Sequence, residues 1–204
     1  MRKIFVTGIG TDVGKTVVSA ILCEALHADY WKPVQTGSFF STDSDKLQKY
    51  ISNSKTVIHP ESYVLKQYMS PHAAAELEGQ HITLANIIPP ATNNTLIIEG
   101  AGGLMVPLND KEFIVDIIIK LKAEAVLVIQ NYLGSINHSL LTIDALRTRN
   151  IPVLGIVFNG PSHKLSEDII LSYSGLKCLG RINKESVINK EIVSKYAALF
   201  KENI

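Results

Sequence analysis

One segment constrains the fold of this chain more than any other: Val6-Thr7-Gly8-Ile9-Gly10-Thr11-Asp12-Val13-Gly14-Lys15-Thr16. An apolar, strand-like run over residues 4–6 leads into it, and apolar residues at helical spacing follow over residues 17–26. A glycine loop that ends in Gly-Lys-Thr between a strand and a helix is typical of a phosphate-binding loop. Backbone N–H groups and the positive end of the helix surround a polyphosphate there, Lys15 adds a charge, and Thr16 can ligate Mg²⁺. The alternative is a tight turn that only connects two buried elements, but the flanking pattern favours nucleotide binding.

The loop is one residue longer than the common pattern. Five residues separate Gly8 from Gly14, whereas the usual loop has four, and Ile9 holds the position of its first glycine. A loop of this length can still wrap phosphates. The longer loop therefore restricts the classes of nucleotide-binding protein to which the chain could belong, but it does not exclude nucleotide binding.

Composition and charge exclude several other classes of protein. With 204 residues, of which 46% are hydrophobic and 19% charged, the chain has the size and balance of one globular domain spanning 1–204. A formal net charge of +1 gives no reason to expect nucleic acid or an acidic membrane as a partner. No apolar stretch is long enough for a membrane span, and residues 1–6 resemble a first strand rather than a signal peptide. Cys23 and Cys178 lie far apart in apolar runs, which favours two free thiols in a reducing cytoplasm.

Short apolar runs alternate with helical patterns along the chain. We expect strands at Lys3–Thr7, Tyr30–Val34, Thr95–Glu99, Ala125–Ile129, Val153–Phe158 and, with a weaker pattern, Lys177–Leu179. We expect helices at Lys15–His27, Asp43–Ser52, Pro71–Glu78, Leu84–Ile88, Phe113–Leu121, Ile136–Arg149, Leu165–Ser174 and Lys190–Lys201. Nearly continuous apolar runs indicate strands that are covered on both faces. The alternation therefore predicts an α/β fold, a three-layer sandwich with a mostly parallel sheet and right-handed crossovers.

Polar residues and glycines follow the predicted strands at the point where each strand ends. They occupy residues 32–37, 99–103, 130–137 and 158–161, in addition to the phosphate-binding loop. In an open parallel sheet, ligands bind beyond the carboxyl ends of the strands. We therefore expect these segments to form one site.

Two charged residues close predicted strands near this loop. Glu99 follows the apolar run 96–98 and precedes three glycines within four residues. An acidic residue in this place commonly holds Mg²⁺, directly or through water, although it could also be a solvated side chain before a flexible turn. Lys32 stands just before Pro33, and it either extends into solvent from a sheet edge or points into the site.

Two predicted helix starts carry further candidate ligands. Asp43 and Asp45 flank Ser44, and both carboxylates are candidate metal ligands; equally, Asp43 could simply cap the helix that follows. Asp45 lies in the first turn, where its carboxylate can face back toward the loops. The segment Gly134–His138, with Ser135 as the expected N-cap, has free N–H groups that either bind a carboxylate or are capped in the ordinary way.

Together these motifs resemble those of the dethiobiotin synthetase family, enzymes of biotin synthesis. The shared pieces are Gly8-x-x-x-x-x-Gly14-Lys15-Thr16, Lys32-Pro33-Val34-x-Thr36-Gly37, Ser44-Asp45, Ser70-Pro71-His72-x-Ala74, Glu99-Gly100-Ala101-Gly102-Gly103 and Leu133-Gly134-x-Ile136-Asn137-His138. They follow the family's order and spacing over about the first 160 residues. The resemblance implies a P-loop NTPase-like fold.

The resemblance also implies ATP-dependent closure of a ureido ring. In the family, one amine of 7,8-diaminopelargonic acid takes up CO₂ as a carbamate, and ATP phosphorylates the carbamate. The second amine then attacks this mixed anhydride, which releases phosphate and closes the ring to give dethiobiotin. ATP as co-substrate and Mg²⁺ are therefore expected. Lys15 and Lys32 would be the catalytic cations, because γ-phosphoryl transfer gathers negative charge on oxygen atoms. Thr16, Asp45 and Glu99 would hold Mg²⁺.

The family's binding residues carry over by matching position. The implied ATP-binding residues are Asp12, Val13, Gly14, Lys15, Thr16, Val17, Asp45, Glu99, Gly100, Ala101, Gly102, Asn159 and Gly160. The implied substrate-binding residues are Thr36, Pro71, Leu133, Gly134 and Asn137. The family is homodimeric, and a helix start of the neighbouring subunit, here residues 133–137, holds the carboxylate of the substrate.

A different class of protein shares a related loop, namely ATP-driven switches of the partition and septum-positioning type. Those proteins carry a lysine near the start of the loop, where this chain has Ile9 and Gly10. A cobyrinate-type amidotransferase is also related, but it needs a glutaminase domain for which 204 residues leave no room. We therefore expect the synthetase, acting in the cytoplasm.

Overall fold

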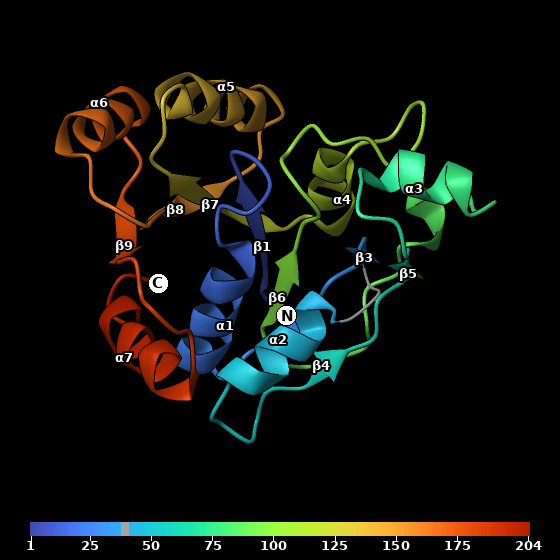
Figure 1. Ribbon diagram of the computed structural model, residues 1–204, viewed down its shortest axis with the longest axis horizontal. Coiled ribbons are helices and arrows are strands. Elements are labelled where there is room, and N and C mark those ends of the chain that lie inside the picture. Colours follow the sequence, from blue (N-terminus) through green and yellow to red (C-terminus); the bar gives the residue numbers. More distant parts are fainter. Residues whose placement is uncertain (38–40) are drawn as a thin grey trace.

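The main sheet of the computed structural model, which describes residues 1–37 and 41–204, has seven strands. All pairs in it are parallel, and the order is β4-β2-β6-β1-β7-β8-β9 (Figure 1). The strands are β1 (Lys3–Gly8), β2 (Asp29–Trp31), β4 (Ile58–His59), β6 (Leu96–Glu99), β7 (Glu124–Gln130), β8 (Val153–Asn159) and β9 (Cys178–Ile182). The expected α/β fold with a mostly parallel sheet is confirmed.

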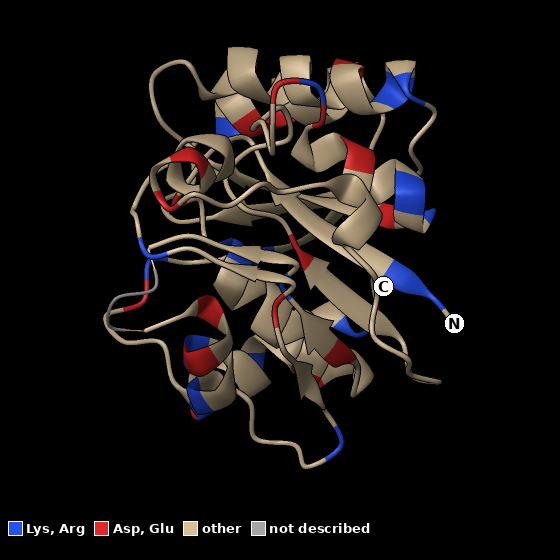
Figure 2. Cartoon of the chain, turned by 90° about the vertical axis from the view of Figure 1, so that its right-hand side faces the viewer, with Lys and Arg blue, Asp and Glu red and all other residues tan. Residues whose placement is uncertain are grey.

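Helices cover both faces of this sheet (Figure 1). On one face lie α1 (Lys15–Leu26), α2 (Asp43–Tyr50) and α7 (Lys190–Phe200), and on the other lie α4 (Ile114–Leu121), α5 (Ser135–Thr148) and α6 (Lys164–Ser174). Side chains of β1 alternate between the two layers, because Ile4 and Val6 join the core under α1 while Phe5 joins the core under α4. Charged residues lie mainly on helices and loops, and the strands carry few of them (Figure 2). Within the described residues, none of the helices combines the length and the apolar character that a membrane span requires.

The strand order brings three loops together at one edge of the sheet. Strand β6 lies between β1 and β2, with Glu99 opposite Val6 on one side and Ile98 opposite Trp31 on the other. The segments that follow β1, β2 and β6 therefore leave the sheet side by side. These segments are the phosphate-binding loop, the residues after Trp31 and the glycines after Glu99.

The predicted strand at Tyr30–Val34 is split in the structure. The chain leaves the main sheet after Trp31 and resumes as β3 (Val34–Gln35), which pairs with β5 (Tyr63–Val64) in a separate two-stranded sheet. Pro33 lies at the break and has no N–H to donate to a sheet ladder. The split frees the Lys32 side chain from the regular alternation of a strand.

Most other predicted elements agree with the structure to within two residues at each end. The helix expected at Leu84–Ile88 is instead a single 3₁₀ turn at Leu84–Asn86, and the strand expected at Lys177–Leu179 runs from Cys178 to Ile182. The sequence pattern predicted neither β4 nor β5, because two residues carry no periodicity. Helix α3 (Pro71–Leu77) begins with proline at its first position, as expected.

Candidate active site

The phosphate-binding loop joins β1 to α1 at the carboxyl edge of the sheet. Gly14 precedes α1 with φ 98°, a left-handed value that favours glycine, and a Cβ there would lie 2.2 Å from Nδ2 of Asn159. Asn159 donates from the same nitrogen to the carbonyl of Val13 (2.9 Å), so it supports the loop from behind. Nζ of Lys15 donates to the carbonyl of Gly10 at 2.9 Å. The start of α1 has no side-chain cap, which leaves its N–H groups for an anion.

Glu99 ends β6 beside this loop and is 1% exposed. Its Oε1 accepts hydrogen bonds from Oγ1 of Thr16 (2.8 Å) and from Nζ of Lys32 (3.1 Å). Its Oε2 accepts one from the hydroxyl of Tyr30 (2.9 Å). Such partners are what a buried carboxylate requires. Because the Thr16 hydroxyl uses its proton on Glu99, its oxygen lone pairs stay available to a cation.

Lys32 lies between two carboxylates and is 4% exposed. Its Nζ contacts Oδ2 of Asp43 and lies 3.1 Å from Oε1 of Glu99. Burial alone would lower the pKa of this ammonium, but the charges of Glu99 and Asp43 more than compensate and hold the pKa above its usual value. Burial also opposes ionisation of Asp43, yet the Lys32 ammonium lowers the pKa of that carboxyl to about 2. Lys32 and Asp43 are therefore both charged at neutral pH.

Lys15 is a second buried ammonium in different surroundings. Burial lowers its pKa to about 8, with the charge of Glu99 opposing the shift and the charge of Lys32 adding to it. Within the described residues, no carboxylate lies within ion-pair distance of its Nζ. An anion that enters the site would therefore meet the Lys15 cation without displacing a counter-ion.

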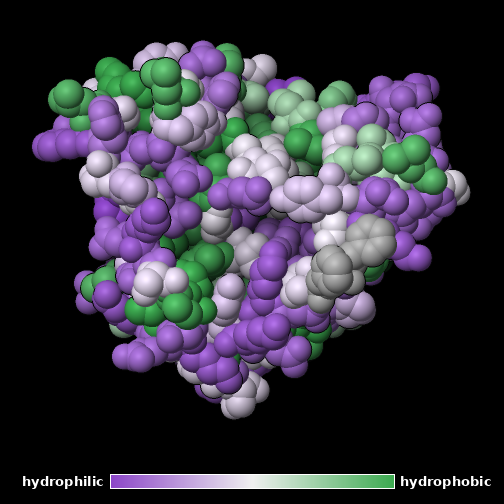
Figure 3. Space-filling view, in the orientation of Figure 1, coloured by the Kyte–Doolittle hydropathy of each residue, from purple (hydrophilic) through white to green (hydrophobic). Residues whose placement is uncertain are grey.

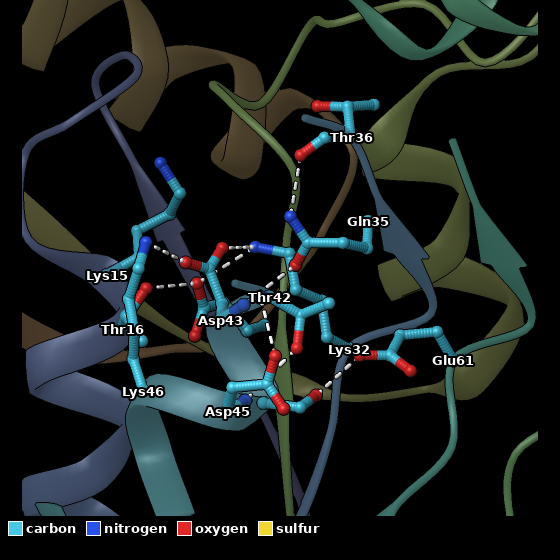
Figure 4. A network of polar contacts seen from close by, with 12 residues as sticks. Lys15, Thr16, Lys32, Gln35, Thr36, Thr42, Asp43, Asp45, Lys46 and Glu61 are labelled. Atoms are coloured by element: carbon cyan, nitrogen blue, oxygen red, sulfur yellow. Dashed lines mark hydrogen bonds and ion pairs between the residues drawn. The ribbon is translucent and has the colours of Figure 1, made fainter. Parts of the chain in front are cut away.

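Lys15, Thr16, Lys32, Asp43 and Glu99 line a cavity of about 300 Å³. Figure 4 shows the network of polar contacts to which Lys15, Thr16, Lys32 and Asp43 belong. Lys46 of α2 also reaches the cavity, and its Nζ donates to Oδ1 of Asp43 at 2.9 Å. A smaller cavity of about 230 Å³ adjoins the first, and Thr36 and Tyr68 belong to the walls of both. Hydrophilic side chains surround a hollow near the centre of the face shown in Figure 3. The smaller cavity has a more apolar lining, to which Pro71 contributes.

The donor set suits a polyphosphate with a hard divalent cation. Thr16, Asp43 and Glu99 offer one hydroxyl and two carboxylates around the larger cavity. Within the described residues, no group of three or more His, Cys, Asp or Glu could hold a metal ion by itself. Mg²⁺ matches such a site, because it prefers oxygen, usually takes one or two carboxylates, and completes its shell with waters and phosphate oxygens.

Comparison with known proteins shows the family of the chain. The family described as an AAA domain matches residues 2–191. The ATP-dependent dethiobiotin synthetase BioD of Cytophaga hutchinsonii is 54% identical over 204 residues, which cover 100% of this chain and 98% of that protein. The enzyme of the same name from Christiangramia forsetii is 48% identical over 203 residues, with 100% and 98% covered. This chain belongs to the ATP-dependent dethiobiotin synthetase family.

Solved structures that resemble the chain do so in fold alone. The cell division ATPase MinD of Pyrococcus furiosus aligns with a TM-score of 0.61 and 15% identity, covering 99% of both chains. A ParA family ATPase from Chlorobium tepidum aligns with a TM-score of 0.55 and 11% identity, covering 97% of this chain and 98% of its own. These matches confirm the P-loop NTPase-like fold. They give no support beyond the fold to the partition-type switch, whereas the dethiobiotin synthetases match in sequence over the whole chain.

Most positions implied by the resemblance to dethiobiotin synthetases meet at the larger cavity. They are Asp12, Gly14, Lys15, Thr16, Val17, Lys32, Thr36, Glu99, Ala101 and Gly102. Two others lie behind its wall. Val13 is 2% exposed, and Gly100 packs so closely on Phe5 that a Cβ would lie 2.8 Å from the ring.

Asp45 does not line this cavity in the structure, and its assignment as a metal ligand and ATP contact stays a prediction. It is the third residue of α2 and forms a capping box with Thr42, whose N–H donates to Oδ2 of Asp45 at 2.8 Å. It lines a separate groove on the outer side of α2. Asp43, the other candidate carboxylate, lines the larger cavity. Asp43 and the fully buried Leu47 are four residues apart and thus share the inner face of the helix.

Asn159 and Gly160 lie at the end of β8, beside the phosphate-binding loop. Gly160 has φ 89°, and its N–H donates to the carbonyl of Ile182 at 2.8 Å. The structure thus gives Asn159 a supporting role for the loop that the sequence did not reveal. Contact of these two residues with the adenine of ATP stays a prediction.

The remaining substrate positions fall into two places. Pro71 lines the smaller cavity next to Thr36. Leu133 and Gly134 line a different cavity of about 440 Å³ at the start of α5, and both they and Asn137 are exposed. The helix begins at Ser135 and Gly134 is the N-cap, so the expectation of Ser135 as N-cap is wrong by one residue. Gly134 has φ 105°, which favours glycine, and the start of α5 has no side-chain cap.

Proposed function

We propose that this chain is a dethiobiotin synthetase. It converts 7,8-diaminopelargonic acid, CO₂ and ATP into dethiobiotin, ADP and phosphate, in the cytoplasm. One observation carries the proposal at the level of residues. Lys15, Lys32, Thr16, Asp43 and Glu99 surround a single cavity at the start of α1, as transfer of a γ-phosphoryl group to a carbamate requires.

The nucleotide lies along the phosphate-binding loop. Its phosphates take the N–H groups at the start of α1 and the Lys15 ammonium, and its adenine reaches Asn159 and Gly160. The unpaired charge of Lys15 supports this assignment.

Thr16, Asp43 and Glu99 hold the Mg²⁺ that accompanies ATP. When bound, the ion supplies charge neutralisation on the phosphate oxygens. Lys32 contacts both carboxylates, and its ammonium lowers the pKa of Asp43 to about 2, which keeps that carboxylate charged at neutral pH. Thr16 contributes oxygen lone pairs, because its proton is donated to Glu99.

Lys32 and the neighbouring backbone serve the carbamate. The carbamate is a weak nucleophile that carries a negative charge, so it needs a fixed cation beside the phosphoryl group it attacks. Lys32 stays protonated because two carboxylates raise its pKa, so it acts by electrostatic stabilisation rather than by giving up a proton. Thr36 lies in the wall shared by the two cavities and holds the amine or carbamate end of the substrate.

The rest of the substrate extends into the smaller cavity past Pro71. Its carboxylate is bound by residues 133–137 of a second copy of the chain, so the active unit is a homodimer. The uncapped start of α5 supports this assignment as an anion site.

A single assay tests the proposal. Phosphate release is measured with ATP, Mg²⁺ and bicarbonate, with and without the diamine, and dethiobiotin is identified by mass. We expect release to depend on the diamine. Release at the same rate without it would favour an ATP-driven switch and overturn the proposal.

A further inference from the structure

Tyr30 lies beneath the candidate site, on the same face of the sheet as Glu99. Strands β2 and β6 are parallel with Tyr30 opposite Ile97, and side chains two residues apart on a strand share a face. Tyr30 and Ile97 both belong to the core under α1. The Tyr30 ring therefore comes up beside the Glu99 side chain from the interior.

The contact between these two side chains is fully buried. The Tyr30 hydroxyl donates to Oε2 of Glu99 at 2.9 Å, and Tyr30 is 0% exposed. The other donors to this carboxylate, Thr16 and Lys32, both use Oε1. Within the described residues, Tyr30 is thus the side chain that donates to the second oxygen.

Donors on both oxygens matter because the terminal torsion of a glutamate is soft. The plane of the carboxylate rotates over a broad range unless partners fix it. With Thr16 and Lys32 on Oε1 alone, the plane could turn about that oxygen.

We propose that Tyr30 is a positioning residue for the reaction, which fixes the plane of Glu99 so that Oε1 faces Thr16, Lys32 and a nucleotide-bound divalent cation. The inference rests on the proposed function, in which ATP and Mg²⁺ occupy this site. Partners behind a metal-binding carboxylate typically change metal affinity by about 10–100-fold when they are removed.

The test is the Tyr30→Phe variant, which keeps the ring and removes the hydroxyl. Calorimetry without the diamine measures the dissociation constant of ATP in excess EDTA and in saturating Mg²⁺. The ratio of the two constants reports the gain in affinity that Mg²⁺ brings. We expect Tyr30→Phe to leave the EDTA value within about twofold and to reduce the ratio by about tenfold.

Tyr196→Phe is the matched control. Tyr196 of α7 is 2% exposed, and its hydroxyl donates to Oε1 of Glu185 at 2.6 Å and accepts from the N–H of Asn183, so Tyr196→Phe also removes a tyrosine–glutamate hydrogen bond. We expect it to lower the thermal midpoint as Tyr30→Phe does but to leave the ratio unchanged. If Tyr30→Phe lowers the midpoint and leaves the ratio intact, Tyr30 is only a core residue and the inference is overturned.

A double variant separates action through Glu99 from other effects. In a Glu99→Gln background, Tyr30→Phe should reduce the ratio no further, and an additional tenfold loss would overturn the inference. Failure of the proposed function has a different signature. In that case the unchanged chain itself shows no gain in ATP affinity from Mg²⁺.

Discussion

At the scale of single residues, the proposed function assigns different roles to the two buried lysines. Lys15 has no carboxylate partner within the described residues and a pKa lowered to about 8 by burial, whereas Lys32 contacts Asp43 and Glu99 and has a raised pKa. Lys15 is therefore available to pair with a phosphate group. Lys32 is held in place by its two carboxylate partners, where it can stabilise the charge that develops during phosphoryl transfer.

Replacing each lysine should therefore give different kinetics. We expect Lys32→Ala to reduce turnover by about 10²–10³-fold, as loss of one stabilising charge does, while ATP affinity stays within a few-fold. Lys15→Ala should weaken ATP binding directly. Calorimetry for ATP and steady-state phosphate release measure the two effects. Equal collapse of ATP binding in both variants would contradict this division.

The lowered pKa of Lys15 predicts that ATP binding takes up a proton. A phosphate beside Lys15 favours its charged form and raises its pKa, so binding near pH 8 must protonate a fraction of the molecules. ATP affinity should be level below about pH 7 and fall by up to about tenfold per pH unit above pH 8. Calorimetry in buffers of different ionisation enthalpy measures the proton uptake. The Lys15→Met variant is the control, and its weaker binding should lose this pH dependence.

Asp43 and Asp45 offer a matched pair for testing the metal site. Asp43→Asn removes a carboxylate at the cavity that contacts Lys32 and Lys46, so we expect turnover to fall by about 10–100-fold with weaker Mg²⁺ dependence. Asp45→Asn weakens only the capping box and should cost about 0.5–1 kcal/mol of stability with turnover intact. Mg²⁺ titrations of phosphate release and urea unfolding distinguish the two. Loss of Mg²⁺ dependence in Asp45→Asn alone would support Asp45 as the metal ligand.

At the scale of elements, α7 connects the C-terminal end of the chain to α1, which carries the site. The ring of Phe200 is 1% exposed and packs so tightly on β9 that a Cβ on Gly180 would lie 2.1 Å from it. No motif in this helix matches a known site, and its inner face is apolar. Its contribution is therefore to the stability of the layer that supports α1.

Two neighbouring substitutions test this role of α7. Phe200→Ala should cost about 3–5 kcal/mol of unfolding free energy, because it leaves a cavity in the core. Leu199→Ala, at a side chain that is 61% exposed, should change it by less than about 0.5 kcal/mol. Urea unfolding gives both values, and phosphate release per folded molecule should be unchanged in each. A selective loss of turnover in Phe200→Ala would show that α7 shapes the site itself.

The sequence predicted the elements with strong patterns, and it failed where tertiary contacts decide. The Gly-Lys-Thr loop and the apolar runs of β1, β6, β7 and β8 carry local signals that fix their type. Which of Asp43 and Asp45 lines the larger cavity depends on the direction that one turn of α2 faces, and the burial of Leu47 shows that direction only in the folded protein. Asn159 supports the phosphate-binding loop through a hydrogen bond to Val13, which lies 146 positions away, so no local sequence pattern could predict this contact.

At the scale of the whole molecule, the proposed homodimer predicts that two inactive variants restore activity when mixed. Each site would combine Lys32 of one copy with residues 133–137 of the other. Lys32→Ala removes the first contribution, and Asn137→Asp places a negative charge where we propose that the substrate carboxylate binds. In an equal mixture, half of the dimers are mixed and one of their two sites is intact, so about a quarter of the original activity should return. Phosphate release at low diamine concentration measures it, and no recovery after subunit exchange would contradict the shared site.

The insertion of β6 between β1 and β2 has a consequence for how the protein is made. Lys32 and Glu99 are 67 residues apart, and they meet only after β6 has entered between two strands that are synthesised before it. A nascent chain that has left the ribosome only as far as β2 holds the complete phosphate-binding loop but cannot yet have its acidic partner. The complete constellation of Lys15, Lys32 and Glu99 therefore forms only after the central strands have assembled in their final order.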